Sequence, residues 1–241
     1  MRTNSSSTSS IVISEDPRLP LPLRMMRLRR SRRLRLRVDH EAGVLKLTMP
    51  WRHSARSAID WVAGQRPWID RELAAAPAGI PLRDGAFVPV EGLQRQIVHQ
   101  PGARRGVQLD GAKLMVGGPA DSLPGAVERW LRALARERLS SAAASIAAEA
   151  GVSIRSVSVG DPVSRWGSCS SSGAIRFSWR LILAPPEVLR FVVAHEVAHR
   201  LHMDHSPAFK AAEERLYGGP VAGARSELRR LGPSLRAVGR G

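Results

Sequence analysis

His195-Glu196-Val197-Ala198-His199 is the stretch that decides the fold of the C-terminal half of this 241-residue chain. It ends an apolar run that begins after Pro185-Pro186-Glu187, and proline followed by an acid is typical of the first turn of a helix. On a helix, His195 and His199 lie one turn apart on the same face. Two imidazoles on one face can bind one zinc ion, so the sequence predicts a metal site here.

A third metal ligand is expected among the histidines that follow. His202 shares the helix face, but it would lie roughly 10 Å from His195 along the helix axis. If the helix ends near residues 201–203, the chain can turn back and place His205 over the metal. Three histidines and one open position are typical of a catalytic zinc site. We therefore expect His205 to be the ligand and His202 to be a supporting or surface histidine.

Glu196 follows the first histidine and is expected to project beside the metal. A carboxylate there can take a proton from zinc-bound water instead of binding the zinc. The predicted chemistry is peptide hydrolysis, in which the activated water attacks a carbonyl and Glu196 passes its proton to the leaving amine. The alternative is a hydrogen-bonded core cluster, but two histidines and a glutamate are poor core residues unless they are paired or bind metal.

The segments around this motif resemble a known family. They are Arg165-Trp166-Gly167-Ser168-Cys169-Ser170-Ser171, residues 173–181, Ala184-Pro185-Pro186 and His205-Ser206-Pro207-Ala208-Phe209. Together they resemble the YgjP-like metallopeptidases, densely over residues 160–212 and more loosely from about residue 30 onward. The chain is more distantly similar to the SprT-like proteases, which act on proteins bound to DNA. Lys210 is a departure, because members of the family usually have tryptophan there.

The resemblance implies a zincin-type fold with one catalytic zinc ion. In it His195, His199 and His205 are the zinc ligands and Glu196 is the catalytic base. In zincins an edge strand beside the metal commonly binds an extended substrate through backbone hydrogen bonds, and we expect that strand at residues 175–180. The candidate substrate contacts are Arg165, Ile175, Arg176 and Phe177. The alternative is that the aromatic side chains of this segment only build the core.

The predicted fold class is α+β, with a β-rich N-terminal half and a zincin-like C-terminal half. We expect a disordered extension at residues 1–20, a β-rich subdomain at 21–118, the metallopeptidase core at 119–221 and a basic tail at 222–241. No internal repeat is visible in the sequence.

Periodicity and breaker residues predict the individual elements. They are a hairpin at 38–47, a helix at 54–75 that Pro67 breaks or kinks, strands at 86–90, 94–99 and 113–116, a long helix at 124–150, strands at 157–159 and 174–183 with a turn at 170–173, and a helix at 208–217.

The net charge of +16 comes almost entirely from arginine. Arginines are concentrated at residues 24–37, where they partly alternate with apolar residues as on a half-exposed strand. Such a cluster can bind nucleic acid or another acidic surface. Because arginine is abundant throughout the chain and few aromatic residues lie nearby to stack on bases, we favour a solvated strand face.

The remaining features concern the compartment and the class of protein. Cys169 is the only cysteine, so no internal disulfide forms, in agreement with a reducing compartment. No apolar run approaches the roughly 18–20 residues that a membrane span needs, and the first residues lack the order of a signal peptide. We therefore expect a cytoplasmic enzyme that acts on a peptide or protein. The alternatives are a nucleic-acid-associated protease of the SprT-like kind and a non-catalytic zinc-binding module.

Overall fold

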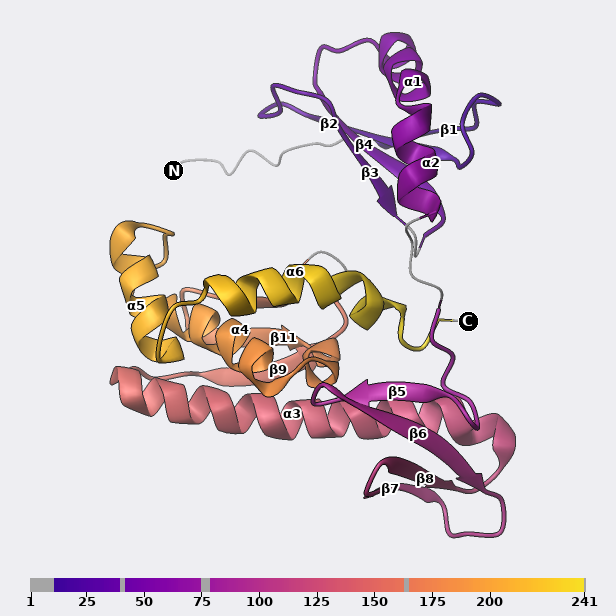
Figure 1. Cartoon of the computed structure of the whole chain (residues 1–241). Coiled ribbons are helices and arrows are strands. Elements are labelled where there is room, and N and C mark those ends of the chain that lie inside the picture. The colour runs from indigo at the N-terminus through magenta and orange to yellow at the C-terminus, as the bar shows by residue number, and fades with distance from the viewer. Residues whose placement is uncertain (1–10, 40–41, 75–78, 163–164, 241) are drawn as a thin grey trace, which may run out of the picture. The chain divides into compact units, whose positions relative to one another are not determined.

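The computed structural model describes residues 11–39, 42–74, 79–162 and 165–240, which form two compact units (Figure 1). The first unit ends at Ala76 and the second begins at Pro77. Both contain helices and strands, so the predicted α+β class is confirmed. The predicted boundary at residue 118 is wrong, because the strands that precede it share the core of the second unit.

The first unit is a four-stranded sheet with two helices on one face (Figure 1). Its elements are β1 (Ile11–Ser14), β2 (Leu23–Leu28), β3 (Arg35–Asp39), β4 (Val44–Pro50), α1 (Ala55–Gly64) and α2 (Arg66–Ala74), and the strand order is β1-β2-β4-β3. Apolar side chains alternate along β2 and β4 and pack with Val62 of α1 and Ile69 of α2. The predicted hairpin and the predicted break between the two helices are confirmed.

The second unit contains all the remaining elements. They are β5 (Phe87–Val90), β6 (Leu93–Gln100), β7 (Gly106–Asp110), β8 (Lys113–Gly117), η1 (Ala120–Ser122), α3 (Leu123–Ala150), β9 (Ser156–Gly160), β10 (Gly167–Cys169), β11 (Ala174–Ser178), η2 (Trp179–Leu183), α4 (Pro186–Ala198), α5 (Pro207–Tyr217) and α6 (Ala222–Ala237). Strand β7 is not among the predicted elements.

Strands β5 to β8 repeat the topology of the first sheet. Their order is β5-β6-β8-β7, with a parallel pair in the middle and an antiparallel strand on each side, as in β1-β2-β4-β3. In both sheets the fourth strand leads into helical structure, α1 in one case and η1 and α3 in the other. The chain therefore contains a repeat of topology that its sequence does not display.

Helix α3 is the scaffold of the second unit. Its buried residues recur at helical spacing from Leu123 to Ala147, and the helix ends at Gly151, whose left-handed conformation closes the last turn. It contacts α4, β9 and η2, as Figure 1 shows for the long helix beneath the sheet. The prediction that this helix packs against the motif-bearing helix is confirmed.

A small sheet of order β10-β11-β9 lies beside α4. The hairpin joins β10 to β11 through the predicted turn, whereas β9 pairs with β11 in parallel. Residues 179–183 form the 3-10 helix η2 instead of continuing the predicted strand. Because β10 pairs with one edge of β11 and β9 with the other, β11 is the central strand, and the prediction that it is an edge strand is wrong.

Both predicted ends of the chain need correction. The basic tail predicted at 222–241 is largely helix α6, whose Ala224, Leu228 and Leu235 enter the core while Arg229 and Arg230 are exposed. Residues 11–14 of the predicted disordered extension form strand β1, and residues 1–10 lie outside the described part of the chain. In the described ranges, no helix has both the length and the apolar character that crossing a membrane requires.

Candidate metal centre

The two histidines of the sequence motif lie at the C-terminal end of α4. The helix starts at Pro186, as the proline pair predicts, and ends at Ala198, so that His199 is its cap residue. The chain then turns at residues 200–202. The helix therefore ends a few residues before the predicted end at 201–203. His205 directly precedes α5, where the Ser206 side chain accepts a hydrogen bond from the Phe209 amide.

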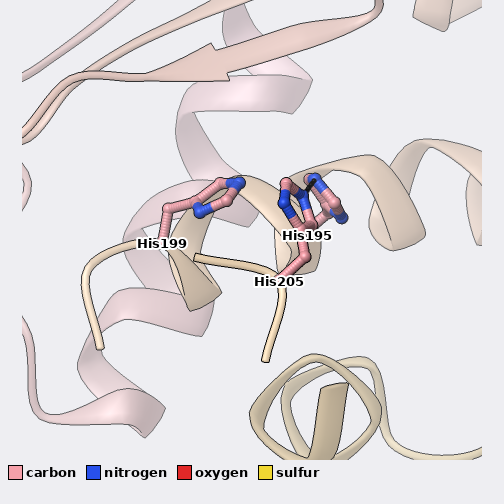
Figure 2. A group of neighbouring side chains, drawn as sticks. All are labelled: His195, His199 and His205. Atoms are coloured by element: carbon pink, nitrogen blue, oxygen red, sulfur yellow. Dashed lines mark hydrogen bonds between the residues drawn. The ribbon is translucent and has the colours of Figure 1, made fainter. Parts of the chain in front are cut away.

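The three predicted ligands converge on one small space. One ring nitrogen from each of His195, His199 and His205 lies within 4.8 Å of the others, and Figure 2 shows the rings gathered at the end of the helix. Nε2 of His205 is 3.4 Å from Nε2 of His195. Two of the rings are half-buried and His205 is exposed, so the group is open to solvent on one side. These three side chains could bind a metal ion.

Hydrogen bonds fix which nitrogen of two rings faces this space. Nδ1 of His195 lies 2.7 Å from Oε1 of Glu213, and Nδ1 of His199 lies 3.2 Å from the backbone oxygen of His202. Because a carboxylate and a carbonyl only accept, each Nδ1 donates, and each Nε2 keeps a lone pair. Burial and then the nearby His195 lower the pKa of His199, which keeps that ring neutral and able to bind metal.

Glu213 on α5 and Arg225 on α6 extend this hydrogen-bond chain into the protein. Glu213 is 1% exposed, and its second oxygen, Oε2, accepts a 2.7 Å hydrogen bond from Arg225. The guanidinium group of Arg225 also lies over the ring of Phe191, 5.6 Å from its centroid. A buried carboxylate is costly without a charged partner, and Arg225 supplies that partner. Glu213 is therefore held where it can orient His195.

Phe209 forms the apolar base of the three histidines. Its ring centroid lies 5.1 Å from that of His195, 4.6 Å from that of His199 and 4.7 Å from that of His205. The ring is 1% exposed, so it excludes water from beneath the imidazoles and limits their rotation. Lys210, which the sequence singled out as a departure, is exposed next to this buried ring.

Glu196 lies next to the first histidine but is almost fully buried, with 5% of its surface exposed. Burial raises its pKa to about 7, against the opposing charge of Arg165. Strand β10 covers it closely at Gly167, where a Cβ atom would stand 2.7 Å from Cγ and 2.8 Å from Cδ of Glu196. The absence of a side chain at Gly167 therefore leaves the space that the Glu196 side chain fills.

The four predicted substrate contacts do not form one group. The side chains of Ile175 and Phe177 are buried in the core, and both backbone edges of β11 are paired with other strands. Arg176 is exposed, with its guanidinium over Gly160, and Arg165 is exposed on the side of Glu196. The residues of β11 therefore support the site from within, and substrate contact by Arg165 or Arg176 stays a prediction.

Cys169 lies at the end of β10. Burial, and then the charge of Glu196, raise the pKa of its thiol, and the thiol donates a 3.4 Å hydrogen bond to the backbone oxygen of Ser170. A raised thiol pKa opposes the thiolate that a nucleophile requires. Its contacts agree with the structural role expected from the sequence.

Sequence reasoning missed Glu213, Arg225 and Gly167. A signal for Glu213 was present, because it falls on the apolar stripe of α5 formed by Phe209, Ala212 and Leu216, where an unpaired acid is not tolerated. No comparable signal marked Arg225 among the many arginines of α6.

Comparison with known proteins gives one result. A family model described as YgjP-like, metallopeptidase domain, matches residues 32–230, which include β3, β4, α1, α2 and every element of the second unit apart from the end of α6. No curated protein and no solved structure matches the chain.

Proposed function

The chain belongs to the YgjP-like metallopeptidase family, and from this premise we propose that it is a zinc-dependent peptidase with a zincin-like catalytic half. One observation carries the proposal: three imidazoles meet at one point, next to a buried carboxylate. A core cluster of polar residues would pair its members with each other. Here His205 is exposed and contacts His195 at 3.4 Å, while the Nδ1 atoms of His195 and His199 bond to partners outside the group.

The donor set fits zinc. Zinc in catalytic sites takes three protein ligands and keeps a fourth position open, and imidazole nitrogen suits it well. His195, His199 and His205 would bind the ion, and the exposed side of His205 leaves the open position accessible. When bound, zinc acts as a Lewis acid that polarises the scissile carbonyl and acidifies water. Glu213 and Arg225 support this arrangement, since ligand histidines commonly donate their second N–H to a carboxylate.

Glu196 would move the proton of the reaction. Its side chain is almost fully buried and packs against Gly167 of β10. It also follows the metal-binding residue His195 directly in the sequence, which places it beside the metal site. In the proposed mechanism its carboxylate takes a proton from the attacking water and gives it to the amine of the leaving peptide. Gly167 contributes by leaving the space in which that carboxylate sits.

We place the substrate on strand β10 instead of β11. Among the described strands β10 has β11 as its only neighbour, so its other edge offers backbone groups to an extended peptide. The strand also reaches the catalytic carboxylate, because Gly167 packs against Glu196. A peptide paired with residues 167–169 would therefore pass beside the metal ligands.

The proposed function is tested with Glu196→Gln. The variant keeps the size of the side chain but removes the proton acceptor, so cleavage of a peptide library by the zinc-loaded protein should fall by about 10²-fold or more while bound zinc stays. Glu187→Gln, on an exposed position in the first turn of the same helix, is the matched control and should cleave as the wild type does. Full activity in Glu196→Gln would refute the role of Glu196, and a zinc-loaded wild type that cleaves nothing would refute the peptidase.

A further inference from the structure

The sheet of the first unit has one covered face and one open face. Helices α1 and α2 cover the face that carries Leu45, Leu47 and Met25 (Figure 1). The strand register places Arg24 of β2 opposite Lys46 of β4, and Lys46 opposite Arg37 of β3, on the other face. Arg35 lies on that same face, two residues from Arg37. All four of these cations are exposed.

A loop adds four more arginines at one end of the sheet. Because β4 lies between β2 and β3, residues 29–34 must pass the end of β4. This loop contributes Arg29, Arg30, Arg32 and Arg33, all of them exposed. We call the eight residues the basic sheet surface: Arg24, Arg29, Arg30, Arg32, Arg33, Arg35, Arg37 and Lys46. The guanidinium of Arg29 lies 5.2 Å from the ring centroid of Trp51, which adds an aromatic face at this end.

Acids neutralise little of this surface. Lys46 pairs with Asp39, but no acid among the described residues pairs with any of its seven arginines. Other arginines of the same unit do pair with acids, as Arg18 does with Asp16 and Arg66 with Asp70. Arg27, which points to the helix side, donates to two backbone oxygens and is excluded from the surface for that reason.

The arrangement costs stability in the free protein. Like charges directly opposite each other on neighbouring strands are destabilising, and neighbouring strands lie only about 4.8 Å apart. Arg24, Lys46 and Arg37 form such a row across three strands. A bound polyanion would turn this repulsion into attraction. Ile13 lies opposite Arg24 on the same open face, and 60% of its surface is exposed. A bound molecule could therefore also make an apolar contact beside Arg24.

We propose that the basic sheet surface binds the phosphate backbone of a nucleic acid, without preference for base sequence. Nucleic acid is the polyanion whose density of charge matches a row of arginines, and guanidinium groups bind phosphate through paired hydrogen bonds. Contacts to phosphate oxygens fix the position of a protein on nucleic acid but carry no information about base sequence. This proposal departs from the solvated-face interpretation that the sequence alone favoured for residues 24–37. The proposal does not depend on peptidase activity, and strand β2 lies outside residues 32–230 that match the family.

Binding is measured with the full chain and a fluorescein-labelled DNA duplex of about 20 base pairs, by anisotropy between about 50 and 200 mM salt. The wild type should bind with a steep salt dependence. Arg35→Gln with Arg37→Gln should reduce the slope of log affinity against log salt by about 1.8, which is about 0.9 for each lost phosphate contact. Arg30→Gln with Arg32→Gln in the loop tests the same surface without altering a strand.

The matched control removes the same charge from the helices of the same unit. Arg56 of α1 and Arg71 of α2 are exposed, and Arg56→Gln with Arg71→Gln should leave the slope unchanged. The proposal is overturned if the control variant loses as much slope as the surface variants, or if the surface variants lose none. It is equally overturned if the wild type binds anionic phosphatidylglycerol vesicles or polyglutamate but not DNA.

Discussion

Oε1 of Glu213 lies 2.7 Å from Nδ1 of His195, and this hydrogen bond links the first residue of the sequence motif to helix α5. His195 must donate through Nδ1, since the carboxylate only accepts, and its Nε2 is therefore turned to the other two histidines. Arg225 bonds the other oxygen of Glu213 at 2.7 Å. One buried carboxylate thus couples three helices to the geometry of the metal site.

The first prediction concerns this carboxylate. Glu213→Ala should weaken zinc binding by about 10- to 100-fold, because His195 loses the partner that orients its ring. Competition with a chromophoric chelator measures the affinity. Glu214→Ala changes the exposed neighbour on the same helix and should bind zinc like the wild type. Equal affinities in the two variants would remove Glu213 from the metal site.

The second prediction concerns the space beside Glu196. Gly167→Ala places a methyl group where the Glu196 side chain now lies and should lower peptide cleavage by about 10²-fold by displacing the carboxylate. Zinc content should not change, because the atoms nearest to the added methyl group belong to Glu196 and not to a metal-binding histidine. Gly223→Ala is the control, since a Cβ there meets no atom within 4 Å. Undiminished cleavage in Gly167→Ala would show that Glu196 tolerates displacement.

The third prediction is a pH dependence of stability. Burial raises the pKa of Asp161, but the hydrogen bonds and charge of Arg180 outweigh it, and the pKa lies below 3.8. Folding therefore favours the ionised form of Asp161, which stabilises the folded state. This stabilisation is fully present at a pH above the ordinary pKa of 3.8, and it is lost as the pH falls through the lower pKa of the folded protein. Arg180 also donates to Leu235 and Val238, so the pair ties η2 to the end of α6.

Asp161→Asn should accordingly destabilise the second unit by about 1–3 kcal/mol near neutral pH. The difference from the wild type should shrink as the pH is lowered below about 4. Calorimetric unfolding at several pH values measures both. Asp121→Asn, on an exposed acid of η1, should show neither effect. A difference that stays constant down to the lowest pH would mean that Asp161 acts through packing instead of its charge.

Local patterns made the centre of the site predictable. His195 and His199 follow from helical spacing alone, and Ser206-Pro207 marks the start of the next helix in the sequence. His205 follows from the reach of a short turn. These features depend on residues close in the chain, where geometry leaves few alternatives.

Non-local pairing explains what the sequence could not show. Alternation identified β11 as a strand, but it does not say that β9 joins its second edge in parallel. The apolar residues of β5 to β8 look like those of β2 and β4, so the pattern cannot tell which core they enter. In α6 the helical spacing of Ala224 and Leu228 was present, but the arginines between them suggested a tail.

The measurement that tests the central claim most directly is the zinc content of purified wild type, His205→Ala and His202→Ala by mass spectrometry. His202 contributes its backbone oxygen to His199, not its ring, so His202→Ala should retain about one zinc, as in the wild type. His205→Ala should lose it. A wild type that takes up no zinc after incubation, or zinc retained by His205→Ala, would contradict the three-histidine site.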